Sequence, residues 1–218
     1  MQKTPPVPAI QQTDMSISKT RQRLVEEARE LFARNGLEAT TMNDIATASG
    51  RGRRTLYTYF RNKEEVYTAV IEGELERLSE RMDEVANMNV RPEEKVFRLI
   101  YTHLRLIRET VARNGSLRAE FFRNIWMVEK VRKTFDEEEK NVLRRVLVEG
   151  VENGSFHIAS VDLLTDIIHY SIKGLEVPYI YDRLGEGLTE EDTYPIVAGL
   201  LRRVLDIRND TPSDRQLL

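Results

Sequence analysis

The stretch TMNDIATASGRGRRTLYTYF, residues 41–60, decides the fold of the N-terminal part of the chain. Thr41 and Asp44 stand three residues apart, which is the spacing of a capping box at the start of a helix. About two turns of helix fit before Ser49-Gly50, where the glycine favours a turn. A further short helix is expected between Gly52 and Asn62. Two short helices joined by a glycine turn predict a helix-turn-helix.

A longer helix is expected before this stretch, from Ser18 to Asn35. Its apolar residues recur at helical spacing, at Leu24, Val25, Ala28, Leu31 and Phe32. We expect it to end at Asn35-Gly36-Leu37, because glycine readily takes the left-handed conformation that follows a helix. The helix-turn-helix would therefore be packed against one long helix.

Further helices are expected down the chain, and no segment shows the alternation of a strand, so the fold class is all-α. The expected ranges are about 63–86, 92–112, 117–126, 128–151, 161–181 and 194–207, with Pro178 breaking or kinking the helix at 161–181.

The expected domains are a flexible leader at 1–17, a DNA-binding domain at 18–63, a larger C-terminal helical-bundle domain for ligand binding and dimerisation at 64–208, and a flexible tail at 209–218.

The charge of the chain is unevenly distributed. The 218 residues have a net charge of −3, which alone argues against nucleic-acid binding. From Lys19 to Lys63, however, ten Lys and Arg residues stand against five Asp and Glu. A basic module followed by an acidic remainder indicates a local surface that attracts phosphates.

The second short helix of the helix-turn-helix separates into two faces at 100° per residue. Leu56 and Phe60 form an apolar edge that we expect to pack on Ile45 and the preceding long helix. Arg54, Thr58 and Arg61 lie opposite, flanked by Thr55 and Tyr57. Arginine can bond guanine in the major groove, and hydroxyls can reach phosphates or base edges. A solvated basic helix is the alternative, but the position of these residues on the exposed helix favours DNA binding.

These residues resemble the N-terminal pattern of the TetR-type transcriptional regulators. The similarity comprises Gly36, Thr41 to Ala46, Ala48 to Gly50 and Thr55 to Val66 at matching spacing. Beyond about residue 70 only the order of helices is similar. One departure lies in the turn, where Arg51 and Gly52 replace the family's small apolar residue and its serine-like cap. Glycine is an acceptable cap, whereas the role of Arg51 is left open.

The resemblance implies a cytoplasmic homodimer that binds a pseudo-palindromic operator in double-stranded DNA, usually as a repressor released by a small, mostly apolar inducer. By the family's pattern, the DNA-contacting positions are Thr41, Asn43, Arg53, Arg54, Thr55, Tyr57, Thr58, Tyr59 and Lys63. From the residues themselves, we expect Arg54 to read bases, Arg53 to serve either bases or phosphates, and Lys63 to bind a phosphate.

Two further sets of residues are candidates in the C-terminal part. Apolar stripes on the last two expected helices could form either a dimer interface or ordinary core, and the resemblance favours the interface. The first stripe comprises Leu164, Ile168, Ile172 and Leu175, and the second comprises Ile196, Leu200 and Val204. Aromatic residues could likewise form core or line a ligand pocket; we nominate Tyr101, Phe122, Trp126 and Tyr170 for the pocket.

Other function classes receive little support from the sequence. The chain has no cysteine, which excludes disulfides and thiolate metal sites. The three histidines, His103, His157 and His169, are scattered without zinc-ligand spacing, and Asp136 to Glu139 read as a solvated helical face. We therefore expect no catalytic site, metal or cofactor, and no membrane segment. A DNA-binding protein of the chromosome that needs no ligand remains an alternative, and a helical enzyme is a weaker one.

Overall fold

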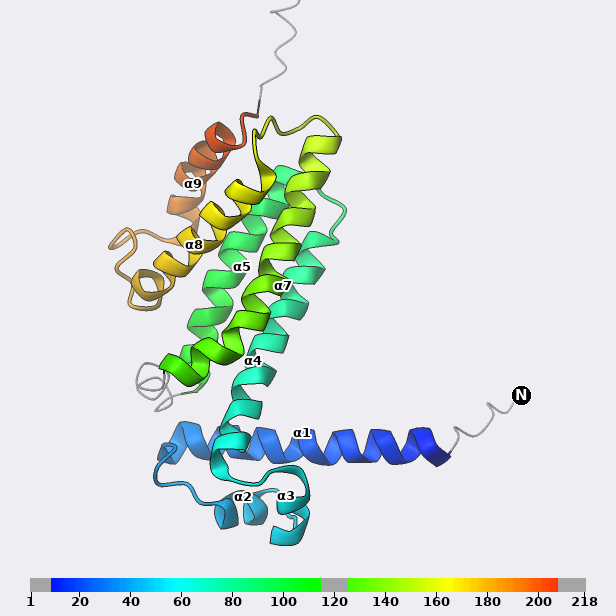
Figure 1. The fold of residues 1–218 in the computed structure, drawn as a ribbon. Coiled ribbons are helices and arrows are strands. Elements are labelled where there is room, and N and C mark those ends of the chain that lie inside the picture. Colours follow the sequence, from blue (N-terminus) through cyan, green and yellow to red (C-terminus); the bar gives the residue numbers. More distant parts are fainter. Residues whose placement is uncertain (1–8, 115–124, 208–218) are drawn as a thin grey trace, which may run out of the picture. The chain divides into compact units, whose positions relative to one another are not determined.

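The computed structural model describes residues 9–114 and 125–207, with side chains at 19–114 and 131–207, and this part is entirely helical (Figure 1). The expected all-α fold class is confirmed. The helices are α1 (Ala9–Asn35), α2 (Met42–Ala48), α3 (Arg53–Tyr59), α4 (Lys63–Ala86), α5 (Pro92–Arg113), α7 (Ile125–Glu152), α8 (Val161–Ile180) and α9 (Glu190–Val204). The helix expected at 117–126 falls outside the described residues, except for its last two positions, which belong to α7.

The chain forms two compact units that differ from the expected domains. The N-terminal unit comprises Met1–Leu75 and Thr110–Arg132, and the C-terminal unit comprises Glu76–Glu109 and Lys133–Leu218. The boundary falls within α4, not before it at residue 64. The physical reason is burial, because Val66, Tyr67 and Val70 on the first turns of α4 are part of the N-terminal core. The ring of Tyr67 meets that of Phe32 edge-on, with centroids 6.1 Å apart.

Local sequence signals account for the ends of α1. Gly36 has a φ of 86° and donates its amide to the carbonyl of Phe32 at 2.9 Å, which ends the helix as expected. The helix begins at Ala9, however, so the expected leader at 1–17 is too long. No proline or glycine occurs between Ala9 and Asn35 to interrupt the helix, whereas Pro8 directly precedes it.

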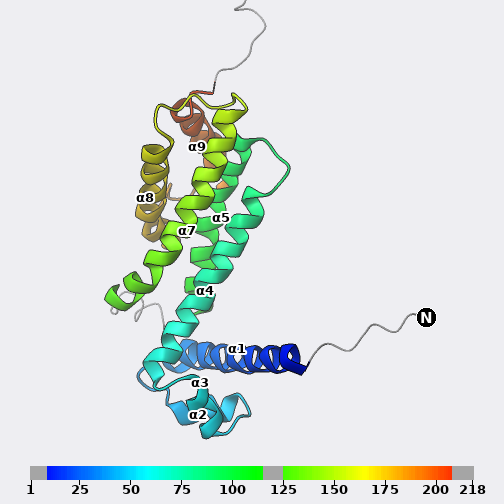
Figure 2. The same ribbon diagram turned by 45° about the vertical axis from the view of Figure 1, so that its right-hand side comes forward.

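The C-terminal unit is a bundle around one apolar core. In both views, α5 and α7 run side by side (Figures 1 and 2). The core is contributed by α5, α7, α8, α9 and the last turns of α4, as shown by the burial of Met82, Leu99, Leu147, Ile168 and Leu201. None of the helices that the structure describes is long and apolar enough to cross a bilayer.

Two helices of this unit depart from their expected ends. α8 runs through Pro178 to Ile180, so the proline lies in the last turn and does not break the helix earlier. α9 begins at Glu190 and not at about residue 194, because Thr189 and Asp192 form a capping box there. The hydroxyl of Thr189 accepts from the Asp192 amide, and the Thr189 amide donates to the Asp192 carboxylate.

Candidate nucleic-acid interface and ligand pocket

The start of α2 is held by the capping box that the sequence predicted. The Thr41 hydroxyl accepts from the Asp44 amide at 3.2 Å, and the Thr41 amide donates to the Asp44 carboxylate at 2.9 Å. The hydroxyl and amide of Thr41 together hold the pKa of Asp44 below its usual value through hydrogen bonds to the carboxylate. The start of the helix-turn-helix is therefore fixed by local bonds.

The turn between α2 and α3 accommodates Arg51 without rearrangement. Gly50 has a φ of 63°, a conformation that glycine adopts without strain. The Arg51 amide donates to the carbonyl of Ala46 at 3.0 Å while its side chain is exposed. Gly52 is the N-cap of α3 and makes no side-chain cap, as its lack of a side chain requires. Arg51 contributes to the turn through its backbone amide and not through its side chain, so its guanidinium is exposed to solvent.

The apolar edge of α3 lies where the sequence placed it. Leu56 and Phe60 are buried, and so are Ile45 and Ala46 of α2. Arg21 of α1 places its guanidinium over the ring of Phe60, 5.4 Å from the centroid. The side of α3 that carries Leu56 is therefore buried, and the exposed residues of the helix lie on its other side.

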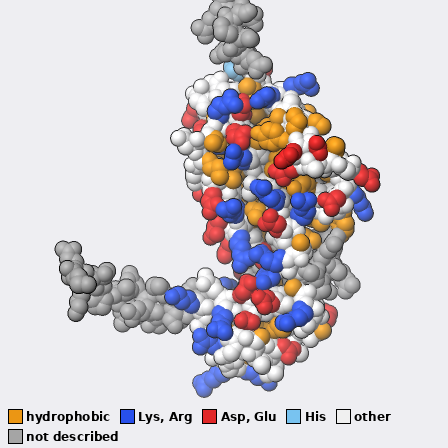
Figure 3. Space-filling view, turned by 180° about the vertical axis from the view of Figure 1, so that it is seen from behind, with side chains coloured by type: hydrophobic (Ala, Val, Ile, Leu, Met, Phe, Trp, Pro, Cys, Tyr) orange, Lys and Arg blue, Asp and Glu red, His pale blue; other side chains and the backbone are white. Residues whose placement is uncertain are grey.

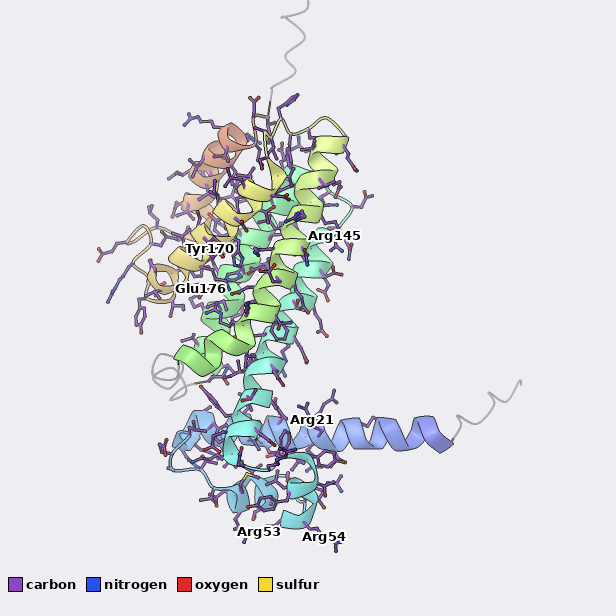
Figure 4. All side chains as sticks on the ribbon, viewed as in Figure 1. Arg21, Arg53, Arg54, Arg145, Tyr170 and Glu176 are labelled. Carbon is purple, nitrogen blue, oxygen red and sulfur yellow. The ribbon has the colours of Figure 1, made fainter. Side chains whose placement is uncertain are left out.

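The exposed side of α3 carries most of the predicted DNA contacts. Arg53, Arg54, Tyr57 and Thr58 are exposed, and Arg53 and Arg54 point outward from the helix (Figure 4), whereas Thr55 and Tyr59 are half-buried. The Thr58 hydroxyl donates to the Arg54 carbonyl at 3.0 Å, so it can still accept a bond from outside. This side presents two guanidinium groups, a phenol and a hydroxyl to a partner.

The remaining predicted contacts flank α3. Thr41 and Asn43 are exposed at the start of α2. Lys63 is half-buried, and its ammonium donates to the Glu38 carbonyl at 3.3 Å, which holds it at the beginning of α4.

The surface around α3 is strongly basic. Between residues 41 and 63 the chain has four arginines and one lysine but only one acidic residue, Asp44, whose carboxylate is engaged in the capping box. Figure 3 shows Lys and Arg side chains gathered at the lower end of the N-terminal unit. Arg61 is drawn back toward Glu65, at 3.9 Å from its carboxylate. An unneutralised basic surface is suited to a phosphate backbone.

The predicted ligand residues are separated in the structure. Tyr101 lines a cavity of about 700 Å³ within the C-terminal unit, together with apolar side chains of α5, α8 and α9. Its hydroxyl lies 3.1 Å from that of Thr193. Tyr170 does not line this cavity, and its side chain is 65% exposed. The side chains of Phe122 and Trp126 lie outside the described residues.

The predicted dimer stripe on α8 is also corrected. Leu164, Ile168 and Ile172 are buried in the core of their own unit, and Leu175 packs against it. The reason is that α8 is apolar on more than one side, so periodicity cannot tell which side faces inward. The apolar residues that α8 exposes are Leu163, Ile167, Tyr170 and Val177. On α9 the prediction agrees with exposure, since Ile196, Leu200 and Val204 face solvent.

A buried polar cluster was missed by the sequence analysis. His103 of α5, Glu139 of α7 and His169 of α8 converge inside the C-terminal unit, with Lys173 and Glu176 beside them. Glu139 is buried, contrary to the expected solvated face, although Glu137 and Glu138 are exposed. Residues so far apart in sequence have no shared spacing, and only the bundle brings them together.

The charged groups of this cluster shift one another's pKa values toward the ionised forms. Burial disfavours the imidazolium of His103, but the carboxylates of Glu139 and Glu176 raise the pKa of His103 above its usual value. Burial likewise opposes ionisation of Glu139, yet His103, His169 and Lys173 hold the pKa of Glu139 well below its usual range. The cluster is therefore an electrostatically coupled group inside the bundle.

Comparison with known proteins agrees with the geometry of α2 and α3. The family model for bacterial regulatory proteins of the tetR family matches residues 24–70. An uncharacterised helix-turn-helix-type transcriptional regulator of Mycobacterium tuberculosis is 37% identical over 91 residues, which are 41% of this chain and 45% of the relative. The chain thus spans about half the length of the curated relatives that it matches in this way.

Two longer matches extend into the C-terminal unit. The helix-turn-helix-type transcriptional repressor KstR2 of Mycobacterium tuberculosis is 28% identical over 161 residues, covering 72% of this chain and 78% of the repressor. The solved structure of the fatty acid degradation regulator FadR from Bacillus halodurans has the same fold, with a TM-score of 0.59 at 21% identity over 95% of this chain and 100% of that one. Residues 24–70, which include the capped α2, the glycine turn and the exposed basic α3, thus form a helix-turn-helix of the type found in bacterial regulatory proteins of the tetR family.

Proposed function

We propose that this protein is a transcriptional regulator that binds a pseudo-palindromic operator as a homodimer. The observation that carries the proposal is the exposed side of α3, where Arg53 and Arg54 point outward beside Tyr57 and Thr58. Arg54 would bond base edges in the major groove, and Lys63 would bind a phosphate at the beginning of α4. Thr41, Asn43, Thr55 and Tyr59 would add backbone or base contacts at the margins. Such a regulator would act in the bacterial cytoplasm, where the chromosome lies.

The dimer would form through α8 and α9. Leu163 and Ile167 on α8, and Ile196, Leu200 and Val204 on α9, are exposed apolar residues of one unit. Exposed apolar residues that recur at helical spacing on two neighbouring helices are typical of an interface. A two-fold axis would pair each helix with its copy in a four-helix contact. The partly buried Leu175 supports these helices from inside and does not itself belong to the contact.

The effector would be a small, mostly apolar molecule bound in the cavity that Tyr101 lines. Its walls include Ile100, Leu104 and Leu188, with Arg108 as a polar group. The Arg108 guanidinium lies over the Tyr179 ring, 4.5 Å from the centroid, and 3.4 Å from the Asp182 carboxylate. A volume of about 700 Å³ is in the range of ligand pockets. Similarity to the repressor KstR2 supports repression as the mode of action.

The experiment that tests the proposal is selection of bound DNA from a random double-stranded pool by the full-length protein. We expect a recovered palindrome with half-sites about 10 base pairs apart or a multiple of that distance, because each α3 would enter a successive major groove. Recovery of DNA without any sequence preference would refute operator recognition and favour a structural DNA-binding protein.

Ligand response is tested separately by thermal unfolding in the presence of small apolar compounds. A ligand at 100 times its dissociation constant stabilises the protein by about 2.7 kcal/mol. We expect such a compound also to weaken operator binding. A compound that binds in the cavity and leaves operator affinity unchanged would refute ligand control while leaving DNA binding intact.

A further inference from the structure

The buried polar cluster of the C-terminal unit has the composition of a metal site. Three helices supply it, with His103 on α5, Asp136 and Glu139 on α7, and His169 on α8. His103 is 0% exposed and His169 is 2% exposed, while Asp136 lies at the partly open side of the cluster. Neither operator binding nor the proposed effector cavity uses these residues.

Both histidines direct the same ring atom at one carboxylate. Nδ1 of His169 lies 3.2 Å from Oε2 of Glu139, and Nδ1 of His103 lies in close contact with Oε1. Within the described part of the chain, these two Nδ1 atoms and Oε1 of Glu139 are buried without a hydrogen bond of acceptable geometry. Buried polar atoms are nearly always bonded, and here the two Nδ1 atoms meet the Glu139 carboxylate, each at a different oxygen.

The orientation of His103 fits metal ligation. Its other ring nitrogen, Nε2, lies 3.0 Å from Oε1 of Glu176, a distance at which it can donate a hydrogen bond. If a metal ion replaces the proton on Nδ1, the proton on Nε2 can remain in the bond to Glu176, and the lone pair of Nδ1 becomes available for ligation. Histidine ligands of metals usually donate their second ring N–H to a carboxylate or carbonyl in this manner. Glu176 would thus set the orientation and tautomer of His103.

We propose that His103, Asp136, Glu139 and His169 bind a divalent transition-metal ion of the zinc class. Ligand atoms of Asp136, Glu139 and His169 already lie within 4.8 Å of one another. An ion with ligands at about 2.0–2.2 Å needs only a small adjustment of these side chains. Two imidazoles select against magnesium and calcium, which prefer oxygen ligands throughout.

The charges of the cluster also favour a dication. The ammonium of Lys173 lies 2.7 Å from Asp136, 3.6 Å from Glu139 and 3.5 Å from Glu176. With neutral imidazoles, these three carboxylates and one ammonium leave two negative charges on the cluster. A divalent ion bound among these side chains cancels them.

The test is binding of Zn²⁺ alone, and of Co²⁺ as a spectroscopic substitute, to full-length protein freed of metal by chelation. We expect one ion per chain, visible absorption bands from bound Co²⁺, and a rise in Tm of about 5–10 °C when free Zn²⁺ exceeds its dissociation constant a hundredfold. Glu139→Gln and His169→Gln should each bind at least tenfold more weakly. His157→Gln is the matched control, because His157 lies outside the cluster, with Nδ1 3.1 Å from the Asp206 carbonyl.

The imidazole NMR signals of the unmodified protein provide a readout that needs no variant. One equivalent of Zn²⁺ should move the signals of His103 and His169 and leave that of His157 in place. The proposal is overturned if these two signals do not move, or if less than one ion binds in excess Zn²⁺. It is equally overturned if folded Glu139→Gln and His169→Gln bind as tightly as the unmodified protein, or if His157→Gln abolishes binding.

Discussion

Replacing Arg54 by alanine should weaken operator binding and broaden base preference. Arg54 is exposed on α3, and no ion pair with it is found among the described side chains, so the substitution should leave the free protein's stability nearly unchanged. Loss of one bidentate arginine–guanine contact costs about 1–3 kcal/mol. A dimer loses two such contacts, hence about 2–6 kcal/mol, or at least about a 25-fold rise in Kd.

The measurement is titration of a selected operator and of random DNA with both proteins at fixed salt. Arg54→Ala should lose affinity for the operator but much less for random DNA, and selection with the variant should yield relaxed sequence at the contacted position. Arg34→Ala is a matched control, because Arg34 is an exposed arginine of the same unit in the last turn of α1. Equal losses of affinity on operator and random DNA would refute base reading by Arg54.

Further predictions concern the phosphate contact, the dimer, the core and the cap. Lys63→Ala should weaken operator and random DNA alike and reduce the slope of log K against log salt by about 0.9 for each lost phosphate contact, as salt-dependent titrations would show. Leu200→Glu, at a side chain that is 60% exposed, should shift the dimer toward monomer in sedimentation velocity, whereas Val90→Glu, at an exposed site on another surface, should not. Leu56→Ala should lower the free energy of unfolding by about 2–5 kcal/mol in urea titrations, because Leu56 is fully buried. The pKa of Asp44 is lower in the folded protein than its ordinary value of 3.8. The stability that its ionised carboxylate contributes through the capping box is therefore fully present above pH 3.8 and is lost as the pH falls through the lowered pKa. Asp44→Asn should remove this part of the pH dependence of the free energy of unfolding.

The sequence was sufficient for the helix-turn-helix because its signals are local. The capping pair Thr41 and Asp44, the left-handed Gly36 and Gly50, and the apolar pair Leu56 and Phe60 act within a few residues of one another. Once Leu56 is buried, the helical repeat alone places Arg54 and Thr58 on the exposed side. The role of Arg51 needed the structure, since only the backbone bond to Ala46 shows that the turn is closed without its side chain.

Tertiary structure decided what the C-terminal unit buries and what it exposes. α8 has apolar residues on two sides, and only packing against its neighbours buries Ile168 and leaves Ile167 at the surface. Likewise His103, Glu139 and His169 have no meaningful spacing in sequence, yet the bundle places them around one point. Local helix signals determine where a helix begins and ends, but the side it turns inward depends on the free energy of the whole core, to which residues far apart in sequence contribute.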